Sequence, residues 1–199
     1  LSANSPYFFG KELWDESRIA VFEQAVDIDA KGCKGNTVKR VTLGNGYIKN
    51  CLSELYEENL ADYPIMLAED LGEVSHKLKH LSLHNGTIWR WTRPIIGIDD
   101  NGAHHLRIEQ RTPSAGPTVK DAMANSMFFI GLIDYLANMK TPPEDLINYD
   151  EAIHNFYKSS RQSFFCQVRW IDGKLYDIKD LLQYEIFPHV KQALLKRGI

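Results

Sequence analysis

The chain has 199 residues, of which 44% are hydrophobic and 25% charged, and its formal net charge is -3. This composition is typical of a soluble globular protein that is long enough for one sizeable core or two small ones. The slight acidity gives no general reason to expect binding to nucleic acid or to an anionic membrane surface. A transmembrane helix is not expected either, because even the most apolar segment, residues 123–139, is broken by Asn125, Ser126 and Asp134.

The three cysteines, Cys33, Cys51 and Cys166, are widely separated and form no CxxC pair. This pattern argues against a disulfide scaffold or a structural zinc site, and it predicts a cytoplasmic protein. The sequence starts at Leu1 rather than at Met, and its first ten residues lack a signal-peptide pattern. We therefore expect a piece of a longer protein.

The first half of the chain predicts two helices separated by turn-rich segments. Residues 16–26 carry apolar side chains at helical spacing, and residues 51–61 do so again. Between them, residues 27–40 are a turn-rich loop, and residues 41–50 suggest a short hairpin or kinked strand around Gly44 and Gly46.

The second half predicts a β-hairpin followed by helices. Residues 82–99 read as a strand, residues 101–104 as a turn and residues 104–113 as the returning strand. A long helix over residues 118–139 opens with Thr118 as N-cap and Asp121 three positions later. The remaining segment is helical at both ends, with a short strand pair around Asp172 and Gly173. Since no linker or internal repeat is present, we expect a single α+β unit over residues 1–199, with an antiparallel sheet.

The predicted hairpin concentrates side chains that bind anions. On the returning strand, Arg107, Glu109 and Arg111 alternate and therefore share one face, with Leu106 and Ile108 on the other. The preceding strand adds further polar and aromatic side chains, namely His84, Asn85, Thr87, Trp89, Arg90, Trp91 and Arg93. Guanidinium groups match carboxylates and phosphates, and a glutamate offers the hard oxygen ligands that Mg²⁺ prefers. One interpretation is therefore a metal and anion site.

The other interpretation is a cross-strand ladder of salt bridges with aromatic stacking, which contributes little to stability pair by pair. Spacing alone does not decide between the two interpretations. Nucleic-acid binding through these Arg and Trp residues is disfavoured, because the chain is slightly acidic and lacks a long basic stripe.

Two further motifs carry weaker signals. The stretch from Thr42 to Tyr47 contains two glycines but lacks the pattern of a phosphate-binding loop. His76, His80 and His84 are spaced four residues apart, but the strand predicted from residue 82 breaks their helical alignment, so a metal is not expected there.

Four segments, residues 3–24, 43–59, 83–97 and 105–132, resemble the glutamate–cysteine ligase family and its carboxylate–amine ligase relatives. They read "ANSPYFFGKELWDESRIAVFEQ", "LGNGYIKNCLSELYEEN", "LHNGTIWRWTRPIIG" and "HLRIEQRTPSAGPTVKDAMANSMFFIGL". They occur in the order expected for the family, and the resemblance covers about residues 1–135.

The resemblance implies a glutamine-synthetase-like fold, in which helices pack against a curved antiparallel sheet whose concave face forms an ATP- and Mg²⁺-dependent site. Such enzymes phosphorylate a carboxylate and let an amine attack the acyl phosphate. In the named family the acid is glutamate and the amine is cysteine, a step of glutathione biosynthesis. Because the family's catalytic domains are longer, the resemblance implies a C-terminal part that is inactive alone. Exposed sheet edges would then need covering, which leaves a homo-oligomer open.

The resemblance also implies roles for individual residues. Glu109 would be a Mg²⁺ ligand, Arg111 would contact the transferring phosphoryl group, and Arg90 and Arg93 would hold anions. The substrate pocket would include further residues, namely Asn4, Ser5, Arg18, Asn85, Thr87, Trp89 and Arg107. The alternative is a non-catalytic module that keeps the ligase fold and binds an anion or a partner.

Overall fold

The computed structural model describes residues 7–8, 11–72, 75–113 and 116–199. It is a mixed α+β structure with small sheets. We expected a single unit, whereas the contacts gather into two compact units, one formed by residues 1–20 and 113–199 and the other by residues 21–112. One boundary falls inside a continuous helix, α1 (Ser17–Ala25), which explains why no linker composition marks it in the sequence.

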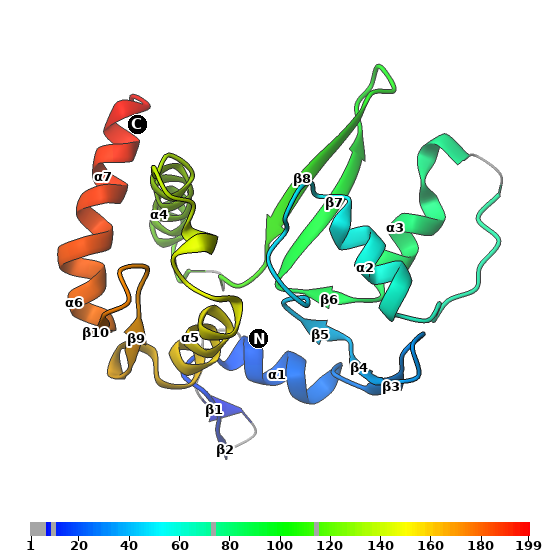
Figure 1. Cartoon of the computed structure of the whole chain (residues 1–199), viewed down its shortest axis with the longest axis horizontal. Coiled ribbons are helices and arrows are strands. Elements are labelled where there is room, and N and C mark those ends of the chain that lie inside the picture. The colour runs from blue at the N-terminus through cyan, green and yellow to red at the C-terminus, as the bar shows by residue number, and fades with distance from the viewer. Residues whose placement is uncertain (1–6, 9–10, 73–74, 114–115) are drawn as a thin grey trace. The chain divides into compact units, whose positions relative to one another are not determined.

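The unit of residues 21–112 contains short strand pairs, helices and the C-terminal part of α1 (Figure 1). Its elements are β3 (Asp29–Lys31), β4 (Thr37–Lys39), β5 (Val41–Thr42), α2 (Glu54–Asp62), the 3-10 helix η1 (Ser75–Lys77), α3 (Lys79–Gly86), β6 (Trp89–Arg90), β7 (Thr92–Ile98) and β8 (His104–Gln110). The pairs β3–β4 and β7–β8 are antiparallel, and β5–β6 is parallel.

The core of this unit lies where the short strands meet the helices. Val38, Tyr63 and Ile88 form one buried cluster, and Trp91 is fully buried as well. Ile88 and Trp91 flank β6 at its two ends. This burial holds the chain in place just before the hairpin, so the first residue of β7 follows directly on a well-packed segment.

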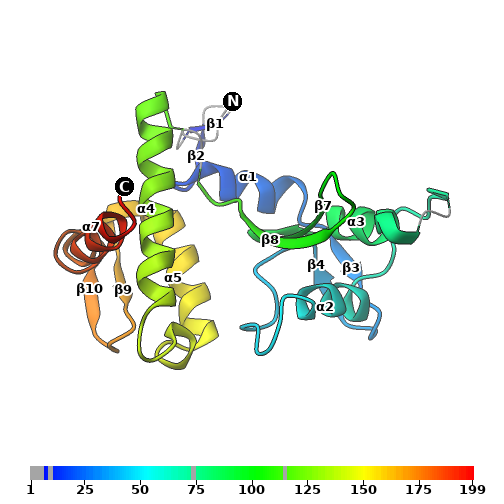
Figure 2. The same cartoon turned by 90° about the horizontal axis from the view of Figure 1, so that it is seen from above.

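The unit of residues 1–20 and 113–199 is mainly helical, and α4 and α7 lie side by side in both views (Figures 1 and 2). Its further elements are β1 (Tyr7–Phe8), β2 (Lys11–Glu12), α4 (Val119–Ala137), η2 (Pro143–Asp145), α5 (Tyr149–Gln162), η3 (Ser163–Phe165), β9 (Gln167–Arg169), β10 (Leu175–Asp177), α6 (Ile178–Asp180), the π-helical η4 (Leu181–Ile186) and α7 (Phe187–Lys196). A buried cluster of Cys166, Val168, Leu181, Ile186 and Val190 forms its core.

Gly131 lets α4 and α7 approach closely. A Cβ atom at Gly131 would lie only 2.7 Å from a methyl group of Val190, so a larger residue would push the helices apart. The helical residues that the structure describes include none long and apolar enough to cross a membrane.

The structure confirms the helices expected near residues 16–26, 51–61 and 118–139, and the two hairpins. The strand expected from residue 82 is wrong at its start, since residues 82–86 belong to α3 and β6 begins at Trp89. The hairpin suggested around Gly44 is also wrong, because β5 pairs with the distant β6. In both places a tertiary contact overrides the local pattern, as when His84 Nε2 contacts the backbone oxygen of Asn59 in α2.

Candidate functional site

The β7–β8 hairpin brings together three charged side chains, Arg93, Glu109 and Arg111, which we call the Arg–Glu–Arg cluster. Arg93 and Glu109 are direct cross-strand partners. Arg93 Nη2 lies 2.8 Å from Glu109 Oε2, and Arg111 Nε lies 3.4 Å from the same oxygen. One carboxylate oxygen therefore orients two guanidinium groups.

Arg111 is held by an aromatic stack as well as by the carboxylate. Its guanidinium carbon lies 3.3 Å from the centroid of the Trp89 ring, and Trp89 is itself stacked on Phe22 at 3.7 Å. The backbone N–H of Arg111 donates to the Trp91 oxygen at 2.9 Å. Backbone and side chain are both fixed, so little conformational entropy would be lost when Arg111 binds a ligand.

The charge balance of the Arg–Glu–Arg cluster favours an anion. Two guanidinium groups and one carboxylate leave a net charge of about +1, and the three side chains are partly exposed, at 25% for Arg93, 39% for Glu109 and 12% for Arg111. Two N–H donors, Arg93 Nε and Trp89 Nε1, are buried and have no hydrogen-bond partner among the residues that the structure describes. The same holds for the acceptor Glu109 Oε2, whose contacts with the two arginines are ion pairs. Such a cluster can position a phosphate or carboxylate group and stabilise its charge.

Arg90, for which the resemblance implies an anion-holding role in catalysis, lies fully buried next to α2. Its Nε donates to Asn59 Oδ1 at 3.0 Å, and its Nη2 contacts Asn59 Oδ1 at 2.8 Å and Glu58 Oε1 at 2.5 Å. Asn85 belongs to the same buried network, since it accepts a hydrogen bond from Asn59 and donates one to the Pro94 oxygen. This geometry shows a structural role for both residues, and their role in catalysis or binding stays a prediction.

The other predicted residues, apart from Trp89, have contacts outside the Arg–Glu–Arg cluster or lie outside the described residues. The Thr87 hydroxyl donates to the His84 oxygen and accepts from Arg40, and Arg107 is exposed and contacts His105 at 3.0 Å. Arg18 belongs to the other unit, where it donates to the Pro113 oxygen at 3.0 Å. Asn4 and Ser5 lie outside the described residues.

Glu109 alone does not make a Mg²⁺ site. Its Oε2 faces two cations, and the described part of the chain holds no group of three His, Cys, Asp or Glu residues suited to a metal. Mg²⁺ takes about six oxygen ligands, so the donor set present here does not fit a complete site.

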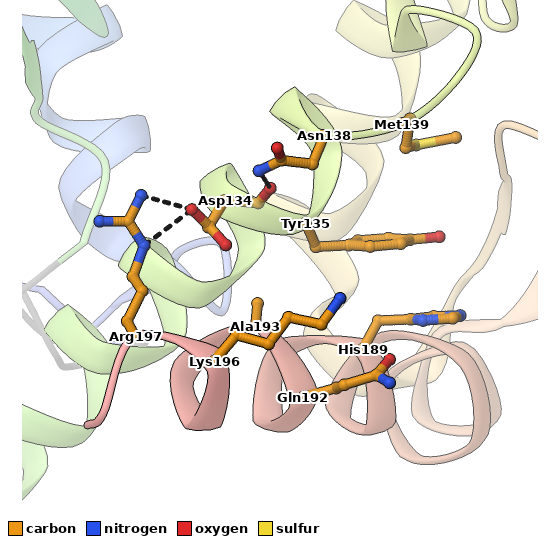
Figure 3. Close-up of a pocket in the computed structure, with 9 residues that line it drawn as sticks. All are labelled: Asp134, Tyr135, Asn138, Met139, His189, Gln192, Ala193, Lys196 and Arg197. Atoms are coloured by element: carbon orange, nitrogen blue, oxygen red, sulfur yellow. Dashed lines mark hydrogen bonds and ion pairs between the residues drawn. The ribbon is translucent and has the colours of Figure 1, made fainter.

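Among the described residues, cavities also lie outside the hairpin, at places that no sequence motif marks. One, of about 520 Å³, lies between α4 and α7, where the Tyr135 ring stacks on His189 at 4.3 Å and Arg197 pairs with Asp134 (Figure 3). Burial raises the pKa of Tyr135, with a smaller contribution from Glu185. The other cavity, of about 590 Å³, is mainly apolar and lies between α3 and the segment after α2.

No protein-family model, curated protein or solved structure matches the chain. The resemblance to the glutamate–cysteine ligase family therefore depends on the four sequence segments alone.

Proposed function

We propose that this chain is part of an ATP- and Mg²⁺-dependent carboxylate–amine ligase of the glutamate–cysteine ligase type, with a glutamine-synthetase-like catalytic fold. The observation that carries the proposal is the fixed position of Arg111, between the Glu109 carboxylate and the Trp89 ring. This is the strand to which the family resemblance assigns the phosphoryl-contacting arginine.

Phosphoryl transfer requires mainly positioning and charge stabilisation from a protein. Arg111 and Arg93 would hold oxygen atoms of the anionic reactants, the ATP phosphates or the substrate carboxylate. Glu109 would keep the two guanidinium groups apart and correctly oriented. The ligands for Mg²⁺ would have to come from residues outside the Arg–Glu–Arg cluster. The roles proposed here for Arg93, Glu109 and Arg111 do not require that these three residues bind the metal.

A second candidate function is a non-catalytic module that binds an anionic small molecule. It is favoured by the incomplete metal donor set and by the engagement of Glu109 with two arginines. Such a module would bind ATP or another polyphosphate at the Arg–Glu–Arg cluster without turning it over.

Phosphate release by the full-length protein that contains this chain, measured with ATP, Mg²⁺, glutamate and a panel of amines that includes cysteine, distinguishes the two functions. A ligase releases phosphate only when both the acid and an accepted amine are present. Glu109→Gln should abolish this release, because it removes the charge that orients Arg93 and Arg111. Glu144→Gln, at an exposed position of the other unit, is the matched control and should keep full activity.

Phosphate release that is independent of every amine would contradict the ligase proposal. Unchanged turnover in Glu109→Gln would remove Glu109 from the site. Binding of ATP with no release under any combination of acid and amine would favour the binding module.

A further inference from the structure

The outer edge of β8 is an open strand edge. The sheet formed by β7 and β8 has two strands, and no third strand pairs with β8 among the described residues. Two apolar side chains on this strand are exposed, Leu106 at 47% and Ile108 at 42%. An exposed strand edge with unpaired backbone groups is a template for pairing with another chain. The seven residues of β8 include neither a proline nor a lysine, which are residues that commonly oppose such pairing.

The outer edge of β7, in contrast, is closed by its neighbours in the same unit. Pro94 has no backbone N–H, and its oxygen accepts a hydrogen bond from Asn85 Nδ2 at 2.8 Å. The Tyr56 hydroxyl is hydrogen-bonded to the backbone of Ile96. These contacts come from α3 and α2, which lie on the β7 side of the hairpin in Figure 1.

The same contacts show which residues of β8 point their backbone groups outward. The Pro94 oxygen faces α3 and not β8, so Pro94 and its cross-strand partner Ile108 are a non-hydrogen-bonded pair. Ile108 therefore directs its N–H and C=O to the open edge, and by alternation Leu106 and Gln110 do so too.

We propose that the open edge of β8 pairs antiparallel with β8 of a second copy of this chain, with Ile108 opposite Ile108 of the second copy. This register aligns the outward backbone groups of residues 106–110 in both copies. It also places Arg107 of each copy opposite Glu109 of the other copy, so the two-fold symmetry gives two such pairs. A register centred on Arg107 would set two arginines against each other, which is unfavourable.

The dimer does not depend on the proposed ligase function, but it would change the candidate site. Arg107 of the second copy would lie beside Glu109 on the face that carries the Arg–Glu–Arg cluster, in a non-hydrogen-bonded pair whose side chains are close. Each cluster would then gain a third guanidinium group from the other copy. The exposed position of Arg107 within one copy, where it contacts His105, leaves it available for this.

Disulfide cross-linking tests the register directly in the full chain. With the exposed Cys33 and Cys51 replaced by Ser, Ile108→Cys places two thiols across the two-fold axis, at a Cα separation of about 5.5 Å that suits a disulfide. Gln110→Cys is the matched control on the same face, because Gln110 would lie opposite Leu106. We expect Ile108→Cys to cross-link at least about tenfold faster than Gln110→Cys. Equal rates, or no cross-linked dimer, would overturn the proposal.

Charge exchange tests the same interface without cysteines. Arg107→Glu alone and Glu109→Arg alone would set like charges opposite each other, so each variant should dimerise at least about tenfold more weakly than the original chain in sedimentation experiments. A mixture of the two variants restores opposite charges at both positions and should form a heterodimer of twice 22.8 kDa.

Circular dichroism of each variant checks that the variant is folded. If Glu109→Arg does not fold, the disulfide cross-linking of Ile108→Cys decides whether β8 pairs with β8 of a second copy. A chain that stays monomeric at every concentration, or a dimer that neither variant weakens, would contradict pairing through β8.

Discussion

Arg90 and Arg111 lie on neighbouring segments of one chain but in opposite environments. Arg90 is fully buried, and the cost of removing its charge from water is offset by Glu58 and by two contacts to Asn59. Arg111 keeps part of its surface in solvent and stacks on Trp89. Of the two guanidinium groups, that of Arg111 is therefore the more accessible from solvent, whereas Arg90 serves the packing of β6 against α2.

The residue-scale prediction concerns Arg90. Arg90→Ala should lower the free energy of unfolding by about 3 kcal/mol, because it leaves Glu58 and Asn59 without their buried partner. Urea denaturation measures this loss. Lys49→Ala, at an exposed position of the same unit, should change the free energy by less than about 0.5 kcal/mol. Equal stability of the Arg90 variant would show that the network contributes nothing.

At the scale of elements, the helix α4 was predictable and the C-terminal half of α3 was not. Thr118 and Asp121 form a reciprocal capping box, a local signal that the sequence carries in full. Residues 82–86 lie before apolar and aromatic residues that read as a strand, but contacts of His84 and Asn85 with α2 hold them in a helix. The turn at residues 101–104 between two strand-like segments was sufficient to predict the hairpin, but the sequence did not predict that Arg93 pairs with Glu109 in register.

The element-scale prediction concerns the N-terminal cap of α4, formed by Thr118 and Asp121. Thr118→Ala removes the hydroxyl that accepts the Asp121 N–H at 3.2 Å, and should destabilise the chain by about 1 kcal/mol. Lys120→Ala, in the same helical turn and exposed, should leave stability nearly unchanged. Thermal unfolding followed by circular dichroism compares the two. A loss of equal size in both variants would assign the effect to the helix surface and not to the cap.

At the scale of the whole molecule, the Arg–Glu–Arg cluster belongs entirely to the unit of residues 21–112. The sequence predicted its three members from strand alternation and family resemblance, and the structure brings them into contact through β7 and β8. The division into two units could not be predicted, because α1 crosses one boundary without a break. Arg18, expected in the same substrate pocket, belongs to the other unit.

Calorimetric titration of the chain with tripolyphosphate tests most directly whether the Arg–Glu–Arg cluster binds a phosphate anion. We predict that Arg111→Gln weakens binding at least about tenfold, which corresponds to about 1.4 kcal/mol. Arg169→Gln, which removes an arginine charge from β9 in the other unit, should bind as tightly as the original chain. An affinity that is unchanged in Arg111→Gln, or no binding by the original chain, would contradict an anion site at this hairpin.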